Sequence, residues 1–172
     1  MEQTRTEAVC EDDFLALMSG FPTGVSVVTS LTPEGQPWGM TCSAVCSVTV
    51  EPPTLLVCLR SASPTCVAIA ASGSFAVNLL DSAARPTAAL FASGDPRRFD
   101  HVEWDTDDRA GGPHLTEAAF SVADCDVDRT EVVGDHTIVI GRVRRVLRRG
   151  VRRPLLYGLR SYSAWPEPAA TA

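Results

Sequence analysis

The stretch of sequence that decides the fold runs from residue 39 to residue 60 and reads GMTCSAVCSVTVEPPTLLVCLR. Two short apolar runs, residues 45–50 and 55–59, flank the turn Glu51-Pro52-Pro53, a pattern typical of two paired strands. The preceding segment, residues 41–44, carries only small side chains, which leave room for a flat ligand to approach the backbone. Its hydroxyls and amides can donate hydrogen bonds without adding a charge. A connecting loop of small residues is the alternative that composition leaves open.

The composition is that of an ordinary globular domain. The chain has 172 residues, 45% hydrophobic and 21% charged, which is enough for one domain with a single core. The net charge of −6 argues against general nucleic-acid binding. No apolar run approaches the roughly 20 residues of a membrane span, and the acidic beginning is unlike a signal peptide. We therefore expect a cytoplasmic protein that binds neither nucleic acid nor membranes.

Six cysteines and three histidines show no pattern of a metal site or a disulfide framework. No two cysteines have Cys-x-x-Cys spacing, and several lie in apolar runs, where cysteine behaves as a small hydrophobic residue. We expect no metal. All 15 basic residues are arginine, and eight of them lie between Arg142 and Arg160 without an acidic residue among them. This window is either a solvated strand face or a surface for phosphate or an acidic partner.

Strand patterns dominate the rest of the chain. We expect strands over residues 25–31, 36–40, 74–80, 115–127 and 137–146, and a closing strand pair within 154–165 around Gly158. Short helices are expected over residues 12–20, 66–71 and 82–91. The fold class that follows is mainly β, a closed or nearly closed antiparallel barrel with a few short helices.

Three details of these elements are also predicted. The helix at residues 12–20 is amphipathic, and Ser63 or Thr65 caps the helix at 66–71. Asn78, polar within an apolar strand, bonds neighbouring backbone. The acidic residues 124, 126 and 128 alternate with apolar ones, which indicates one wet face of a strand.

The residues offer little for catalysis by a side-chain nucleophile. The chain has no Gly-x-Ser-x-Gly motif and no glycine fingerprint for a dinucleotide or phosphate loop. Hydrolysis by paired carboxylates stays open, although the acids mostly lie in polar turns. Chemistry carried by a bound cofactor is favoured. His136, which follows Gly134-Asp135, is the one titratable residue expected at a reaction centre, and an ordinary turn residue is the alternative.

A series of short fragments is spread along the chain in a specific order. They are FPTGV at residues 21–25, TCSA at 41–44, SV at 47–48, EPP at 51–53, FAVNLL at 75–80, FA at 91–92, RF at 98–99, GDH at 134–136 and PLLY at 154–157. Together they resemble the flavin reductase family, which has the FMN-binding split-barrel fold. The resemblance covers residues 13–165, so we expect flexible tails over residues 1–12 and 166–172.

The resemblance implies a homodimer of closed split β-barrels, each binding one flavin near the subunit interface. The likeness is greatest to the reductase components of two-component flavin-dependent monooxygenases. NADH or NADPH would reduce FMN or FAD by hydride transfer, and the reduced flavin would diffuse to a partner monooxygenase, for example one of secondary metabolism. The choice of flavin, of nicotinamide nucleotide and of partner stays open.

The resemblance also implies roles for particular residues. His136 matches the family histidine that meets the nicotinamide ring, residues 41–44 would lie along the isoalloxazine, and Arg98 would add a cation near the phosphate. Ser43-Ala44 stands where many relatives have Asn-Ser, and Arg98 replaces a common lysine. The full set of expected flavin-binding residues is Met40, Thr41, Cys42, Ser43, Ala44, Leu59, Arg60, Ser61, Ser63, Thr65, Phe91, Arg98, Phe99, Tyr157 and Arg160.

Two other functions fit the same fragments. A non-catalytic split-barrel module would bind flavin or haem without oxidising NADH. An oxidase similar to the pyridoxamine-phosphate oxidases would hold its flavin tightly and purify as a yellow protein. Both remain alternatives at the level of sequence.

Overall fold

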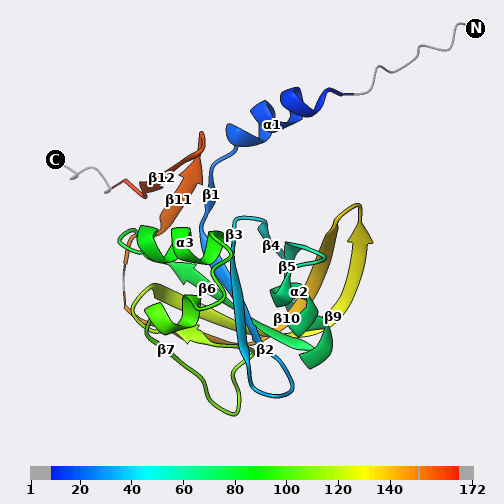
Figure 1. Ribbon diagram of the computed structural model, residues 1–172, viewed down its shortest axis with the longest axis vertical. Coiled ribbons are helices and arrows are strands. Elements are labelled where there is room, and N and C mark those ends of the chain that lie inside the picture. Colours follow the sequence, from blue (N-terminus) through cyan, green and yellow to red (C-terminus); the bar gives the residue numbers. More distant parts are fainter. Residues whose placement is uncertain (1–8, 151, 167–172) are drawn as a thin grey trace, which may run out of the picture.

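The computed structural model describes residues 9–150 and 152–166. Figure 1 shows a strongly coiled sheet with two helices, α2 and α3, packed against it. The elements are α1 (Glu11–Ser19), β1 (Thr23–Gly24), β2 (Ser26–Leu31), β3 (Pro37–Cys42), β4 (Val45–Val50), β5 (Pro53–Arg60), α2 (Pro64–Ser72), β6 (Ser74–Leu80), α3 (Arg85–Ala92), a 3-10 turn (Arg98–His101), β7 (Trp104–Asp105), β8 (His114–Leu115), β9 (Ala119–Val133), β10 (His136–Arg148), β11 (Leu155–Gly158) and β12 (Ser161–Ala164).

The main sheet has seven strands in the order β3-β2-β6-β9-β10-β5-β4, and every pairing in it is antiparallel. The expectation of a mainly β fold with few helices is confirmed. The closed barrel is not found: within the described residues β3 and β4 are sheet edges with no ladder between them. Where β3 passes into β4, the turn is bound to β5, because Cys58 N donates to Ala44 O at 3.0 Å.

Strand β2 is buried on both faces, and its first five residues are all buried although three of its six residues are polar. Val27 and Val28 are neighbours in β2, point to opposite faces and are both fully buried. Val27 belongs to a core cluster with Phe91 of α3, and Val28 to a second cluster with Ile69 of α2. The two helices therefore hold the β2–β3 edge from opposite sides.

The predicted first helix forms as α1 but has no buried residue. Phe14 is 54% exposed and Leu17 is 70% exposed. Figure 1 shows α1 standing away from the sheet, joined to it through β1. Its amphipathic pattern thus has no matching surface within the described chain. The expected tails lie largely in residues 1–8 and 167–172, outside the described residues.

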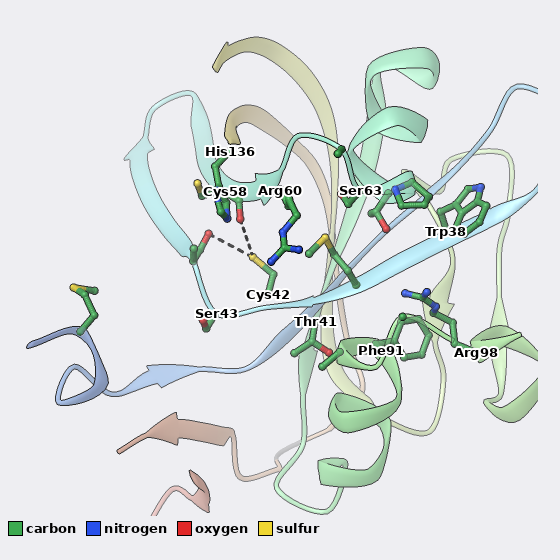
Figure 2. Close-up of a pocket in the computed structure, with 18 of the residues that line it drawn as sticks. Trp38, Thr41, Cys42, Ser43, Cys58, Arg60, Ser63, Phe91, Arg98 and His136 are labelled. Carbon is green, nitrogen blue, oxygen red and sulfur yellow. Dashed lines mark hydrogen bonds between the residues drawn. The ribbon is translucent and has the colours of Figure 1, made fainter. Parts of the chain in front are cut away.

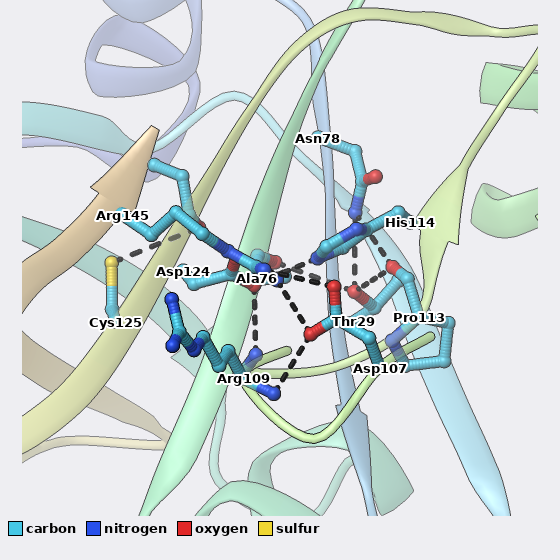
Figure 3. Close-up of polar contacts among 12 residues, drawn as sticks. Thr29, Ala76, Asn78, Asp107, Arg109, Pro113, His114, Asp124, Cys125 and Arg145 are labelled. Atoms are coloured by element: carbon cyan, nitrogen blue, oxygen red, sulfur yellow. Dashed lines mark hydrogen bonds and ion pairs between the residues drawn. The ribbon is translucent and has the colours of Figure 1, made fainter. Parts of the chain in front are cut away.

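The prediction of a wet strand face is wrong for Asp124, which is fully buried. Its carboxylate accepts hydrogen bonds from Gly111 N at 2.7 Å, His114 Nε2 at 2.8 Å and Arg145 Nε at 2.7 Å (Figure 3). Arg145 also binds Asp107 through two bonds of 2.8 and 3.0 Å. The chain between residues 106 and 113 folds over this part of β9, and alternation along one strand cannot reveal such a cover.

Four arginines of the arginine-rich window form ion pairs with aspartates earlier in the chain, namely Arg142, Arg144, Arg145 and Arg149. Cross-strand ion pairs join Arg142 to Asp128 at 3.3 Å and Arg144 to Asp126 at 3.1 Å. The side chains of both pairs are 36–62% exposed, and such surface pairs contribute little to stability. The window is therefore an ion-paired strand face, closer to the first of the two interpretations offered by the sequence.

Asn78 bonds backbone as predicted. Its Nδ2 donates to Val27 O and Pro113 O, each at 3.2 Å, and its Oδ1 accepts from Leu115 N at 2.9 Å. These bonds fasten the segment before β8 to the middle of the sheet. No helix among the described residues has the length and hydrophobicity needed to cross a bilayer.

Candidate functional site

A cavity of about 1040 Å³ opens where the sheet fails to close, between β3 and β5 (Figure 2). This volume is at the upper end of the roughly 300–1,000 Å³ of typical small-molecule sites. Its walls come from β3, the turn into β4, β5, the start of α2, α3 with the loop after it, and α1. The lining residues are Phe14, Met18, Trp38, Met40, Thr41, Cys42, Ser43, Ala44, Cys58, Arg60, Ala62, Ser63, Pro64, Thr65, Phe91, Ala92, Gly94, Arg98 and His136.

The free edge of β3 supplies backbone hydrogen-bonding groups to this cavity. Thr32 N donates to Gln36 O at 2.9 Å, so this pair is a hydrogen-bonded one in the β2–β3 hairpin. Hydrogen-bonded and non-hydrogen-bonded pairs alternate along an antiparallel ladder. Counting from Gln36, Gly39 and Thr41 are in non-hydrogen-bonded pairs, so their N–H and C=O groups point away from β2. Arg98 Nη1 donates to Gly39 O at 2.6 Å, in agreement with this direction. The Thr41 amide is therefore available to a ligand.

The side chains of β3 alternate between the two helices. Met40 and Cys42 face α2, since both belong to the cluster around Ile69. Gly39 and Thr41 face α3. Thr41 Oγ1 donates to Ala88 O at 2.6 Å, so its hydroxyl proton is already engaged and its amide is the donor that remains. A Cβ on Gly39 would lie 2.9 Å from Cε1 of Phe91, which explains how α3 approaches the strand so closely.

Two thiols line the cavity and both are neutral at physiological pH. Burial raises the pKa of Cys42 to about 11 and also raises the pKa of Cys58. The thiolate, and not the thiol, is the nucleophile. Neither cysteine is therefore suited to covalent catalysis, and this part of the wall carries no charge.

One end of the cavity, at the start of α2, carries hydrogen-bond donors of the kind that suit an anion. Ser63 caps this helix, as predicted, by accepting from Cys66 N at 3.2 Å, so its own hydroxyl proton stays free to donate. Thr65 is 2% exposed and its hydroxyl has no hydrogen-bond partner among the described residues. Every fully buried side-chain N or O in the described chain has a hydrogen-bond partner. The Thr65 hydroxyl has none, so it is not fully buried and must reach the open cavity. The first amides of a helix add partial positive charge there.

Arg98 faces the same end from the other side. Its Nε donates to Asp95 O and its Nη1 to Gly39 O, each at 2.6 Å, and its side chain is only 7% exposed. Nη2 has no acceptor in the described chain and, by the same reasoning as for Thr65, opens on the cavity. Burial lowers the pKa of Arg98, but a guanidinium remains charged at neutral pH. Arg98 is thus a fixed cation with one free nitrogen.

His136 lies at the opposite end, where β10 begins. It pairs with Arg60 of β5 and its ring is 45% exposed. Nδ1 lies 2.7 Å from Oδ1 of Asp135, a hydrogen bond that lowers the pKa of Asp135. With Nδ1 donating to this carboxylate, Nε2 is the nitrogen left for a ligand. In Figure 2, His136 and Ser43 lie at one end of the site and Arg98 and Trp38 at the other.

Most of the predicted site residues line this cavity, but five do not. Leu59 is fully buried in the core, because strand alternation turns Cys58 and Arg60 toward the cavity and Leu59 away from it. Ser61 bonds Thr137 Oγ1 at 2.8 Å, and Phe99 packs edge-on against Phe91 at 5.1 Å. Arg160 lies in the tight turn between β11 and β12. Tyr157 lines an adjoining cavity of about 210 Å³ with Val25 and Tyr162, and this cavity shares Thr41, Ser43 and Ala92 with the first.

Sequence reasoning missed several lining residues. Trp38, Met40 and Cys42 are two residues apart and therefore lie on the same face of β3. This period could have identified Trp38 as a lining residue. Cys58 could have been found in the same way from Arg60. Phe14 and Met18 come from α1, and no local pattern relates that helix to β3.

Comparison with known proteins gives a consistent result. Residues 18–166 match the model of a flavin reductase like domain. The chain is 48% identical over 153 residues to a flavin reductase (NADPH) of Lentzea aerocolonigenes, covering 89% of each chain. It is 34% identical over 151 residues to HsaB, the reductase subunit of a flavin-dependent monooxygenase of Rhodococcus jostii, covering 88% of this chain and 76% of that protein. A solved structure of the Streptomyces globisporus NADH:FAD oxidoreductase SgcE6 with NAD and FAD fragments aligns with a TM-score of 0.85 at 30% identity, covering 95% of this chain and 99% of that one.

Proposed function

Because this chain belongs to the flavin reductase family, we propose that its large cavity binds FMN or FAD beside a reduced nicotinamide nucleotide and that the protein is an NAD(P)H-dependent flavin reductase. The observation that carries this proposal is the division of the cavity into three parts. An uncharged strand edge with small residues lies between an anion site at Arg98 and an exposed, oriented histidine at position 136.

In the proposed complex the flavin has one orientation. The isoalloxazine lies along residues 41–44, where the Thr41 amide donates toward N5 or O4 and small side chains admit the ring. The phosphate lies between Arg98 and the start of α2, where Ser63 and Thr65 each have a hydroxyl free to donate. The nicotinamide ring then stacks on the exposed side of the isoalloxazine, beside His136.

A bound flavin supplies N5 as the acceptor of the hydride that leaves nicotinamide C4, so NAD(P)H is oxidised as the flavin is reduced. The protein aligns the two rings, and this positioning is its main contribution to the rate. The Thr41 amide stabilises the negative charge that grows on the reduced ring. His136 Nε2 orients the nicotinamide through a hydrogen bond. The neutral thiols of Cys42 and Cys58 keep the wall free of competing charge.

Replacing His136 with alanine should lower kcat/KM for NADH or NADPH by about tenfold, the value of one lost orienting hydrogen bond in a site of this kind. The dissociation constant of oxidised flavin should change less than about twofold, because His136 lies at the nicotinamide end. Absorbance at 340 nm measures turnover and flavin titration measures binding. His101, an exposed histidine outside the cavity, gives the matched control His101→Ala. Equal losses of turnover and flavin binding would contradict the assigned role.

The same assay separates the two other functions. A binding module takes up flavin or haem but does not oxidise NADH under any condition. An oxidase with tightly held flavin purifies yellow and keeps its absorbance through dialysis. A flavin reductase that releases its product oxidises NADH only when FMN or FAD is added.

We further propose that residues 13–165 form a split-barrel domain and that two copies assemble with α1 in the interface. Support comes from the apolar surface of α1, where Phe14, Leu17 and Met18 are 54%, 70% and 46% exposed. Since Phe14 and Met18 also line the cavity, a second copy that covers α1 would complete the flavin site.

Leu17→Glu should convert the dimer to a monomer, because a carboxylate in an apolar interface is left without a partner. Size-exclusion chromatography with light scattering measures this change. Asp12→Ser, a polar replacement on the same helix, should leave the dimer intact. An unchanged mass for Leu17→Glu would remove α1 from the proposed interface.

The reduced flavin is proposed to leave the cavity and diffuse to a partner monooxygenase. The likeness to a monooxygenase reductase subunit supports this step. We also propose a cytoplasmic location. All six cysteines are free, and Cys10 and Cys46 are exposed, which suits a reducing compartment.

A further inference from the structure

The cavity continues past the proposed phosphate site. Along β3 the order is fixed: Thr41 faces the isoalloxazine, Gly39 is held by the phosphate-binding Arg98, and Trp38 comes next. The lining of the cavity also includes Ala62, Ala92 and Gly94, whose small side chains leave space. Figure 2 shows the Trp38 indole at this end of the site, away from Ser43 and His136. FMN ends at its phosphate, so this space lies beyond it.

Trp38 is not accounted for by core packing. It is half-buried, yet it does not pack against either of the two core clusters. Trp104, which is also half-buried, belongs to the first cluster and lies edge-on to Phe99 at 5.6 Å. Trp38 instead lines the cavity, on the same side of β3 as Met40 and Cys42. The part of the indole that is not covered thus faces the cavity, at the end where Arg98 lies.

We propose that Trp38 stacks on the adenine ring of FAD and makes this protein prefer FAD over FMN as its flavin. This inference rests on the proposed function. A second phosphate extends the flavin past Arg98, whose guanidinium pairs with the pyrophosphate, and the adenine then reaches the indole. Stacking suits this site because Trp38 offers a π-face, and stacking does not depend on hydrogen bonds to a particular base.

The test compares two flavins on two variants. Oxidised FAD and FMN are titrated calorimetrically into the wild-type protein, Trp38→Ala and Trp38→Phe. An aromatic–base stack corresponds to roughly tenfold in affinity, so Trp38→Ala should weaken FAD by about that factor and leave FMN within about twofold. Trp38→Phe keeps an aromatic face and should retain most of the FAD affinity. Trp165→Ala, at an exposed tryptophan outside the cavity, should change neither.

The two failures can be told apart. A wild-type protein that binds neither FAD nor FMN counts against the proposed function itself. A wild-type protein that binds both, with a Trp38→Ala variant that weakens them equally or not at all, overturns only the adenine contact. Should Trp38→Ala fail to fold, Trp38→Leu replaces it, because leucine keeps apolar bulk without a π-face. Equal FAD affinity of Trp38→Leu and Trp38→Phe would then overturn the inference.

Discussion

Replacing Asp124 with alanine should lower the free energy of unfolding by about 3–5 kcal/mol, the loss observed when one partner of a buried ion pair is removed. The carboxylate is fully buried and accepts from His114, Arg145 and Gly111 N (Figure 3). Without it, the buried His114 Nε2 and Gly111 N lose their acceptor, and the half-buried Arg145 keeps only its two bonds to Asp107. Urea denaturation at pH 7 measures the effect.

Asp126→Ala is the matched control on the same strand. Asp126 is two residues away and is exposed, and it pairs with Arg144 at the surface. Its removal should cost less than about 1 kcal/mol. Similar losses for the two variants would show that the buried network is not what makes Asp124 important.

The same network should make the protein sensitive to acid. Burial alone raises the pKa of Asp124, but hydrogen bonds from His114, Gly111 and Arg145 outweigh it, and the pKa is lowered overall. A carboxyl group with a lowered pKa in the folded state stabilises the fold above its unfolded pKa of about 3.9 and loses this contribution as the pH falls through the folded value. Asp124→Asn should therefore show a flatter dependence of stability on pH below about 4 than the wild-type protein.

Much of the fold follows from patterns that are local in sequence. The strands on either side of Pro52-Pro53 and strand β6 were predictable because alternation and turn residues act over a few positions. The burial of Asp124 was not predictable, because it depends on residues 106–113 folding across β9. The open edge between β3 and β4 was not predictable either, because pairing or separation of two edge strands depends on packing between distant segments, such as α2 and α3 on β3.

In the candidate site, too, local features were predictable and features that depend on distant segments were not. Residues 40–44 were predictable as one group because they are contiguous and small. Leu59 was misassigned within a correct segment, since alternation in β5 points its side chain into the core while its two neighbours face the cavity. The position of Phe14 and Met18 in the cavity lining could not be inferred, because neither the sequence of α1 nor that of β3 indicates that the two elements lie near each other.

Arg98→Ala should weaken FMN binding by about 10- to 100-fold, which corresponds to the roughly 1.5–3 kcal/mol of a hydrogen bond to a charged group. Riboflavin has the same ring and ribityl chain but no phosphate, so its affinity should change far less. The contrast between the two ligands tests the phosphate contact directly. Calorimetric titration of both oxidised flavins measures it.

Controls are needed because Arg98 also links β3 to the loop that precedes Arg98. Its guanidinium donates to Gly39 O in β3 and to Asp95 O in that loop. Arg97→Ala removes an exposed arginine next to it and should leave both affinities unchanged. Arg98→Lys keeps the charge but loses the planar fork that serves two carbonyls and a ligand at once, so its FMN affinity should be intermediate. If Arg98→Ala weakened riboflavin as much as FMN, the side chain would act by shaping the cavity, and the phosphate would have to be held by α2 alone.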